Sequence, residues 1–465
     1  MKRVNSEKYR VERDTFGEIE VPIQAYWGAQ TQRAIENFKI SNYKMPKEII
    51  RAIALIKYAS AQVNGELGLI DKGFSEYIKI SAEEIIYSED FSNFPIDVFQ
   101  TGSGTSTNMN VNEVIATRAN EILTGEKKTT SPIHPNDHVN KGQSSNDVIP
   151  TSIRIATALL IESELLPKLN VLRESIFHKA HQFRNIIKTG RTHLMDAVPI
   201  SFGQEFSGWL KQIENGIERI KSVFTRLVEL PIGGTAVGTG LNTHPEFSKR
   251  VVEIISEKTG IQFKVAENKF EGIASMDIAN EVSGQLKTIA GSLMKISNDI
   301  RLMNSGPFSG MSEITIPSLQ PGSSIMPGKV NPVIPEAVRM VCARVIGNDT
   351  TISISCSLGE FELNVMLPII GFCLVESITL LANSSYLLAK KVIDGIRVNK
   401  KKVQEVLEKN PIVVTSLTPI IGYEKASEIY KKALTENKTI REILIQEKIL
   451  PPDKVDEYLS FEKMI

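Results

Sequence analysis

Four polar loops of the chain concentrate side chains that could bind and transform a small anion. They read TGSGTSTNMN from residue 101, HPNDHVNKGQSSND from residue 134, GRTHLMD from residue 190 and GSSIMPGKVN from residue 322. Their hydroxyls, amides, imidazoles and lysines supply many hydrogen-bond donors and few acceptor carboxylates. This excess of donors predicts a substrate that itself carries carboxylates, such as a dicarboxylate.

Residues 321–332, PGSSIMPGKVNP, form either an inert connector or part of a site. Three prolines and two glycines exclude a regular helix or strand there. Loops of this composition are most often inert connectors. The two serines, the lysine and the asparagine of the loop favour a site, so the choice depends on the rest of the chain.

Nucleotide and metal cofactors are not predicted. The GSGT stretch is a weak glycine-rich signal that more often marks a turn, and Val330 stands where a phosphate-binding loop needs Ser or Thr. None of the six histidines belongs to an H-E-x-x-H motif. Taken alone, His134 would head a turn, and His193 would be a loop or capping histidine.

The composition predicts a soluble globular protein of two or three domains. The chain has 465 residues, of which 42% are apolar and 23% charged. Its 54 basic and 54 acidic residues cancel, which disfavours a nucleic-acid partner and favours a small-molecule substrate. No uncharged apolar run of about 18 residues is present, so membrane insertion is not expected.

Cysteine usage and the first residues predict a cytoplasmic location. Cys342, Cys356 and Cys373 lie in apolar helical surroundings without C-x-x-C spacing, which is typical of buried, reduced thiols. The opening residues MKRVNSEKYRVERD mix acidic with basic side chains and lack an apolar core. Neither a signal peptide nor a transit peptide is therefore predicted.

Long helices must position the polar loops, so a mainly α fold is predicted. Apolar residues recur at helical spacing from about residue 45, and roughly five long helices follow in the middle of the chain, which favours an up-and-down bundle. One of them is expected over residues 273–304. We expect a mixed, mostly helical domain over 1–140, a bundle domain over 141–395 and a small helical domain over 396–465.

The segment Ile369 to Leu388 is nearly uncharged apart from Glu376. A helix that is apolar on every side must be buried on every side. One bundle of about five helices cannot bury every face of each member. Association with further copies of the chain is therefore expected.

The four loops, together with GGTAVGTGLN from residue 233, resemble the fumarase/aspartase superfamily, and most closely its class II fumarases. The resemblance runs from about residue 11 to 460 and keeps the order and spacing of the family's loops. It implies three domains, a central five-helix bundle and a homotetramer with a twenty-helix core. It also implies active sites that are each lined by loops of three chains.

The resemblance assigns roles to residues of these loops. The family adds or removes a group across a four-carbon dicarboxylate, and removing a proton next to a carboxylate creates a dianion that needs donors around it. Lys329 and Asn331 fit that need. The resemblance implies Ser323 as the base, delivered by a mobile lid, and His193 at the leaving-group end, paired with Glu336. By its position alone, Glu336 could instead stabilise a helix N-terminus.

Further residues are implied to hold the substrate. The implied substrate-binding residues are donors of loops or helix starts: Ser103, Gly104, Thr105, Ser144, Ser145, Asn146, Thr192, Ser324, Lys329, Val330 and Asn331. A second, peripheral dicarboxylate site is implied at His134, Pro135, Asn136 and Asp137. The resemblance implies no cofactor and no metal.

The leaving group distinguishes two members of the superfamily. Hydroxide needs a proton in order to leave, whereas an ammonium group departs as neutral ammonia. His193 therefore favours water, because aspartases resemble one another in carrying Gln there. The implied activity is reversible hydration of fumarate to L-malate, a step of the tricarboxylic acid cycle. The alternatives are an aspartate ammonia-lyase and a non-enzymatic helical assembly protein, which would be expected to lack Ser323, His193 or Lys329.

Some positions depart from the fumarase pattern. Met195 stands where Gln is usual, and Gly142 stands where a bulkier residue is common. The stretches IENFKISN, VIGNDTTIS and ELNVMLPIIG look more like aspartase, but they lie outside the loops that carry the chemistry.

Overall fold

The computed structural model describes residues 8–465, and over this range it contains seventeen α-helices and only two-stranded sheets. This confirms the predicted mainly α fold. The chain forms two compact units. Unit 1 comprises residues 1–166, 218–288 and 344–381, and unit 2 comprises residues 167–217, 289–343 and 382–465. The three-domain division remains a prediction.

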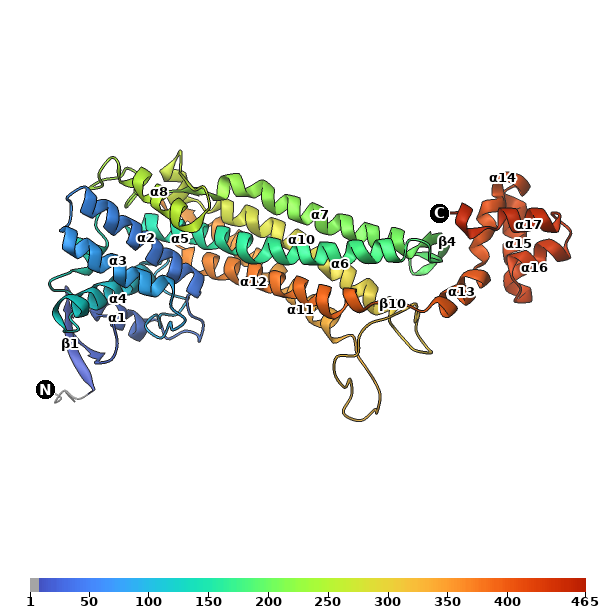
Figure 1. Cartoon of the computed structure of the whole chain (residues 1–465), viewed down its shortest axis with the longest axis horizontal. Helices are drawn as coiled ribbons and strands as arrows, with labels where there is room; N and C mark the ends of the chain where they lie inside the picture. Colours follow the sequence, from blue (N-terminus) through green and yellow to red (C-terminus); the bar gives the residue numbers. More distant parts are fainter. Residues whose placement is uncertain (1–7) are drawn as a thin grey trace. The chain divides into compact units, whose positions relative to one another are not determined.

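Unit 1 is built around α2, which packs against α3, α5 and α8 (Figure 1). The α-helices that lie wholly within this unit are α1 Ala29–Asn37, α2 Lys47–Glu66, α3 Lys72–Ile86, α4 Thr105–Thr124, α5 Ser145–Leu160, α8 Phe247–Thr259 and α9 Lys269–Ala274. Ile49, Ile53 and Ile56 of α2 are fully buried because apolar residues recur at three and four along this helix. Asp71 begins α3 by accepting the backbone N–H groups of Gly73 and Phe74.

Short strand pairs complete unit 1. Strands β1 Tyr9–Asp14 and β2 Gly17–Pro22 form an antiparallel hairpin in the part of the chain for which mixed pieces were expected. Two further pairs join β5 Glu229–Leu230 to β6 Lys264–Val265 and β8 Gly359–Glu360 to β9 Leu363–Asn364.

The long helices expected in the middle of the chain are present. They are α6 Leu166–Gln182, α7 Phe202–Leu227, α10 Asp277–Met303, α11 Val333–Cys356 and α12 Leu367–Lys391. One boundary differs from the prediction, because α9 ends at Ala274 and α10 begins at Asp277. The break lies at Ser275, which has an extended backbone and whose Oγ accepts the N–H of Asp277 at 3.2 Å. A local serine turn therefore interrupts the apolar pattern.

Helix α12 confirms the apolar character of its segment. Residues Leu367–Gly395 contain an 18-residue window with a mean hydropathy of 1.6 and are long and apolar enough to cross a membrane by length and composition alone, which was not expected from the sequence. Of their most apolar window, 67% is buried inside the fold. Gly371 explains part of this burial, because an added Cβ would lie 2.7 Å from Ile49 and 3.0 Å from Ile153. Glycine thus lets α12 approach α2 and α5 closely, as expected for a core helix.

Unit 2 contains the hairpin of β3 Ile187–Thr192 and β4 Met195–Ser201, and the pair of β7 Ile314–Thr315 with β10 Arg397–Val398. It ends with short helices, in the region for which a small helical domain was expected. These are α13 Lys400–Lys409, α14 Thr418–Ile421, α15 Tyr423–Glu436, α16 Ile440–Gln446 and α17 Pro452–Tyr458.

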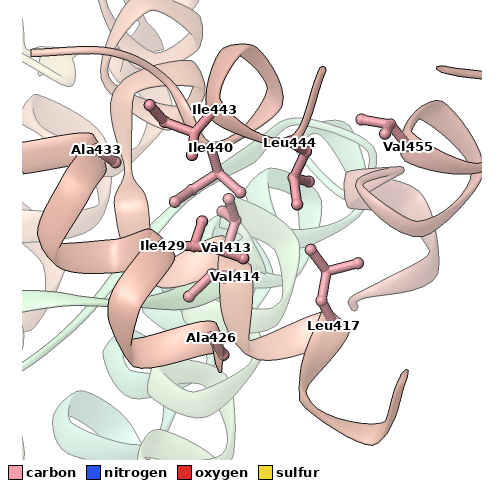
Figure 2. Packing of buried hydrophobic residues seen from close by; sticks show 10 residues of the cluster. All are labelled: Val413, Val414, Leu417, Ala426, Ile429, Ala433, Ile440, Ile443, Leu444 and Val455. Carbon is pink, nitrogen blue, oxygen red and sulfur yellow. The ribbon is translucent and has the colours of Figure 1, made fainter. Parts of the chain in front are cut away.

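The carboxy-terminal helices share a small apolar core. Figure 2 shows its side chains converging from the 3₁₀ segment Pro411–Leu417 and from α15, α16 and α17. The core residues are Val413, Val414, Leu417, Ala426, Ile429, Ala433, Ile440, Ile443, Leu444 and Val455. Each helix is too short to be stable alone, so this shared burial is what orders them.

The three cysteines are free. Cys342 and Cys373 are buried, as predicted, whereas Cys356 is only half-buried. Burial raises the pKa of Cys342 and of Cys356 to about 12 and that of Cys373 to about 11. All three are therefore protonated, unreactive thiols near neutral pH.

Candidate active site

The first polar loop ends at the N-terminus of α4. Gly104 is the N-cap residue with φ +72°, and an added Cβ would lie 2.9 Å from Ile149. The hydroxyls of Ser103 and Thr105 are hydrogen-bonded to each other at 2.8 Å. The backbone N–H groups at the start of this twenty-residue helix face the loop, and the helix dipole favours an anion there.

The second polar loop ends at the N-terminus of α5. Ser144 is its N-cap and forms a capping box with Asp147. The Ser144 hydroxyl accepts a backbone N–H of the first turn, and the Asp147 carboxylate accepts the backbone N–H of Ser144. Asn146 donates its amide to the carbonyl oxygen of Ala236 at 2.8 Å. Local capping and a contact to the GGTAVG loop therefore both contribute to the order of this loop.

Asp147 also joins the GGTAVG loop to the second loop. Its Oδ1 accepts the N–H of Ser144 at 2.9 Å, while Oδ2 accepts the N–H groups of Gly233 at 2.8 Å and Thr235 at 2.9 Å. Burial raises the pKa of Asp147 to about 6, although these backbone donors act in the opposite direction. Sequence reasoning assigned no role to Asp147.

Buried amides bring the first two loops together within unit 1. Asn108, one turn into α4, donates to the hydroxyl of Ser145 at 3.0 Å and to Oδ1 of Asn140 at 3.2 Å. Lys57 donates to Asn140 at 2.8 Å and to Gln143 at 2.9 Å. The N-termini of α4 and α5 are thereby linked, and the helix dipole favours an anion at each of them.

Lys57 was missed by sequence reasoning. It is fully buried in α2, and burial lowers the pKa of its ammonium group to about 7. A signal was available, because Lys57 stands seven residues after Ile50 and four after Ile53, on the apolar stripe of the helix. A lysine on such a stripe requires buried partners.

The predicted second dicarboxylate segment is a single turn of π-helix, Pro135–Val139, in unit 1. His134 heads it, as expected: its Nδ1 accepts the N–H groups of Asn136 at 3.2 Å and Asp137 at 3.3 Å. The Nδ1 of His138 accepts the N–H of His134 at 2.8 Å. Asn136 and Asp137 are exposed.

The hairpin of unit 2 presents Thr192 and His193. Thr192 pairs with Met195, so His193 and Leu194 form a two-residue turn, in which their φ angles are +56° and +61°. Such a turn usually carries Asn or Gly, because a left-handed backbone is unfavourable for other residues. His193 is exposed beside two exposed apolar side chains, those of Leu194 and Met195. The candidate catalytic residue His193 therefore has a strained backbone.

The loop that carries Ser323 closes on itself. The N–H of Gly322 donates to the carbonyl oxygen of Lys329 at 2.8 Å, and the amide of Asn331 donates to the carbonyl oxygen of Gly322 at 2.7 Å. An added Cβ at Gly322 would lie 2.6 Å from that Lys329 oxygen, so glycine is required for the closure. Ser324 and Val330 are exposed on this loop.

Two backbone donors point at the hydroxyl of Ser323. Its Oγ accepts the N–H groups of Ile325 at 3.2 Å and Met326 at 3.0 Å. The exposed Lys329 makes no side-chain hydrogen bond to Ser323 in the described chain. The loop therefore supplies polar stabilisation of the Ser323 oxygen from its own backbone.

Glu336 lies in the first turn of α11. Among residues 8–465, no hydrogen bond or ion pair joins Glu336 to His193, or His193 to Ser323. The pairing of Glu336 with His193 remains a prediction for the assembled protein.

The structure accounts for one of the two departures from the expected pattern, Gly142. Gly142 has φ +71°, so its backbone favours glycine, although an added Cβ would meet nothing closer than 3.7 Å. Met195 is 69% exposed beside the His193 turn. Over the described residues, no group of three or more His, Cys, Asp or Glu side chains could hold a metal ion.

Comparison with known proteins identifies the relatives of this chain. A family model described as Lyase matches residues 17–347, and one described as Fumarase C C-terminus matches residues 413–465. A "Fumarate hydratase class II" of Xylella fastidiosa is 53% identical, covering 99% of this chain and 96% of its own. The enzyme of that name from Thermus thermophilus is 49% identical, covering 97% of each chain. The crystal structure of recombinant class II fumarase from Schistosoma mansoni matches with a TM-score of 0.96 and 40% identity, covering 98% and 99% of the two chains.

Proposed function

The chain belongs to the class II fumarase family of lyases, and we propose that it adds water reversibly to fumarate, giving L-malate, at the loops described above. The observation that carries this function is the match over almost the full length of relatives named fumarate hydratase, with 53% identity. Aspartate ammonia-lyase is the less favoured activity. The polar loops and helix starts of this chain fit a substrate that carries two carboxylates.

The substrate carboxylates bind at the linked N-termini of α4 and α5. Ser103, Gly104 and Thr105 provide donors at one helix start, and Ser144, Ser145 and Asn146 provide them at the other. Support comes from the helix dipoles, which favour an anion at both places, and from Asn108, which holds the two starts together. Thr192, Ser324, Lys329, Val330 and Asn331 complete the binding set.

Ser323 removes the proton from the carbon next to a substrate carboxylate. A serine hydroxyl is a poor acid near neutral pH, so its oxyanion needs stabilisation. The N–H groups of Ile325 and Met326, which already point at this oxygen, provide part of it. The positive charge of Lys329 and the amide of Asn331 support the dianion that forms on the substrate.

His193 protonates the hydroxide that leaves malate, directly or through water. Its exposed position at the tip of a hairpin suits a residue that projects into a site built with other segments. Glu336 orients the imidazole in the assembled enzyme. His134, Pro135, Asn136 and Asp137 form a second, peripheral dicarboxylate site.

The enzyme is a cytosolic homotetramer of three-domain chains, whose five-helix bundles form a twenty-helix core. Exposed apolar side chains on two long helices support this assembly. Met340, Ile354 and Leu358, in and just after α11, are 69%, 58% and 49% exposed, and Tyr386 and Leu387 of α12 are 45% and 41% exposed. A monomer would leave this surface in water. The active sites combine loops of three chains.

The discriminating experiment follows the absorbance of the fumarate double bond with malate and with aspartate in parallel, with no metal or nucleotide added. Turnover of malate and fumarate, with aspartate inert, is the expected result. Turnover of aspartate but not of malate would replace the proposed activity with ammonia elimination. The same assay in the presence of a chelator tests the expectation that no metal takes part.

A further inference from the structure

We propose that Glu313 is a positioning residue, whose buried carboxylate holds the hairpin turn that presents Thr192 and His193. The inference rests on the proposed function, in which His193 handles the leaving hydroxide. In the proposed arrangement, Glu313 does not contact the substrate. It acts through Arg191, which stands two residues before His193 in the chain.

Glu313 is the centre of a buried charged cluster in unit 2. Its Oε1 lies 2.7 Å from a guanidinium nitrogen of Arg191, and its Oε2 lies 2.8 Å from Nζ of Lys188. Glu313 and Lys188 are almost completely buried, with side chains only 2% exposed. Lys188 also pairs with Glu205 at 2.9 Å. A buried carboxylate between two cations is strongly constrained, since losing either partner leaves charge unpaired.

The two cations reach Glu313 from either side of an irregularity in the pairing of β3 with β4. Lys188 and Arg191 are three residues apart, and regular strand alternation would place them on opposite faces. The pairing register shifts between Thr189 and Arg191, where β4 has one residue more than β3, so the pairing is irregular at the point where both side chains reach Glu313. Gly190 lies at the shift, where an added Cβ would be 2.5 Å from the carbonyl oxygen of Val198. Glycine is therefore required between the two residues that contact Glu313.

The backbone of Glu313 is held as firmly as its side chain. Its N–H donates to the carbonyl oxygen of Met303, at the end of α10, at 2.8 Å. Its carbonyl oxygen accepts the N–H of Asn399 at 2.8 Å. Glu313 also stands ten residues before Ser323, at the start of the segment that leads to the closed loop. One residue therefore anchors both the His193 hairpin and the approach to the Ser323 loop.

The turn needs such an anchor because its backbone is strained. His193 and Leu194 both have positive φ, a conformation that costs of the order of 1 kcal/mol or more per residue and persists only when the surroundings enforce it. If Arg191 is released, the turn can relax and the imidazole moves. A displacement of about 1 Å can lower a rate by about a hundredfold.

The test compares Glu313→Gln with Glu205→Gln, measured as malate dehydration by the tetramer. Glutamine keeps the volume of residue 313 but removes the charge that holds Arg191, so kcat should fall about tenfold or more. Glu205→Gln is the matched control, because Glu205 pairs with Lys188 but has no ion pair with Arg191. Its kcat should stay within about twofold of wild type.

A double-mutant cycle separates positioning of His193 from a general structural role. If Glu313 acts through His193, adding Glu313→Gln to His193→Asn should lower kcat by less than about threefold beyond His193→Asn alone. A multiplicative loss in the double variant overturns the inference. So does a near-normal kcat for His193→Asn, because the residue being positioned would then have no role.

Arg191→Gln provides the same test if Glu313→Gln does not fold, because it leaves the buried pair of Lys188 and Glu313 intact. Its kcat should also fall about tenfold or more, with the same non-additivity toward His193→Asn. An active wild-type enzyme with normal rates in a folded Glu313→Gln or Arg191→Gln variant overturns the inference alone. A wild-type protein that turns over neither malate nor fumarate defeats the proposed function instead.

Discussion

The two side chains proposed to transfer protons, Ser323 and His193, lie in chemically different surroundings. The Ser323 oxygen receives two backbone N–H groups from its own loop, whereas His193 projects from a strained turn into solvent. The first setting suits an oxygen that must carry negative charge, and the second suits a group completed by other segments. A separate substitution therefore tests the role of each residue.

Ser323→Ala and His193→Asn should each lower kcat by at least about tenfold to a hundredfold, because both residues act on proton transfer. Neither side chain belongs to an apolar core, so the thermal midpoint and the oligomeric state should stay unchanged. Steady-state kinetics with malate, together with sedimentation, provides the measurement. A variant with near-normal kcat would remove its residue from the mechanism.

His138 should make stability sensitive to pH. Its Nδ1 accepts the N–H of His134, and burial lowers the pKa of the ring. Because the pKa is lower in the folded state, the unfolded chain binds the proton first as pH falls through about 6.5, and stability is lost in that direction. His138→Gln should reduce this loss, measured as the urea midpoint at several pH values.

The exposed His178 offers the control for this measurement. His178→Gln should leave the pH dependence of the urea midpoint unchanged. If His138→Gln and wild type lose stability equally between pH values of about 8 and 5.5, the destabilisation belongs to other groups.

Asp147 connects the second polar loop and the start of α5 to the GGTAVG loop. Its two oxygens accept three backbone N–H groups from two loops. The side chain thus joins the capping of α5 to the GGTAVG loop. A neutral amide cannot replace it, since one end of an amide is a donor.

Asp147→Asn should lower the free energy of unfolding by about 2–4 kcal/mol, because an amide N–H₂ would face a buried backbone donor. The KM for malate should rise as well, because Ser144, Ser145 and Asn146 lose their fixed geometry. Chemical denaturation and steady-state kinetics measure the two effects. Asp277→Asn, at an exposed first-turn position of α10, is the matched control and should cost less than about 1 kcal/mol. Equal costs in the two variants would show that Asp147 contributes only ordinary helix capping.

The assembled protein should be needed for activity. Mixing Ser323→Ala with His193→Asn under subunit-exchange conditions should restore turnover, because some hybrid sites receive intact copies of both residues from different chains. The recovered fraction is visible because each parent variant is strongly impaired. Mass spectrometry of the mixture verifies exchange. A fully active monomer, or verified exchange without recovered activity, would contradict sites shared between chains.

The amino-acid sequence alone determined the helical fold class, the apolar nature of α12 and the loops in which chemistry is expected. These features depend on local pattern, since periodicity and Pro or Gly content are properties of neighbouring residues. The resemblance to fumarases, later supported by relatives of nearly equal length, depended on the order of five such loops. A local interaction also explains why one helix was expected over residues 273–304 although the structure has a break at Ser275. A serine turn interrupts the helix there, within a continuous apolar pattern.

Only the tertiary structure decided which distant residues meet. Nothing local indicates that Asn108 reaches Ser145, or that Glu313 receives both Lys188 and Arg191. The position of Lys57 on an apolar stripe indicates burial, but only the packed fold shows that the amide oxygens of Asn140 and Gln143 are its partners. The positive φ of His193 likewise follows from the register of a hairpin. Such contacts depend on packing between segments far apart in the chain, which a local pattern does not encode.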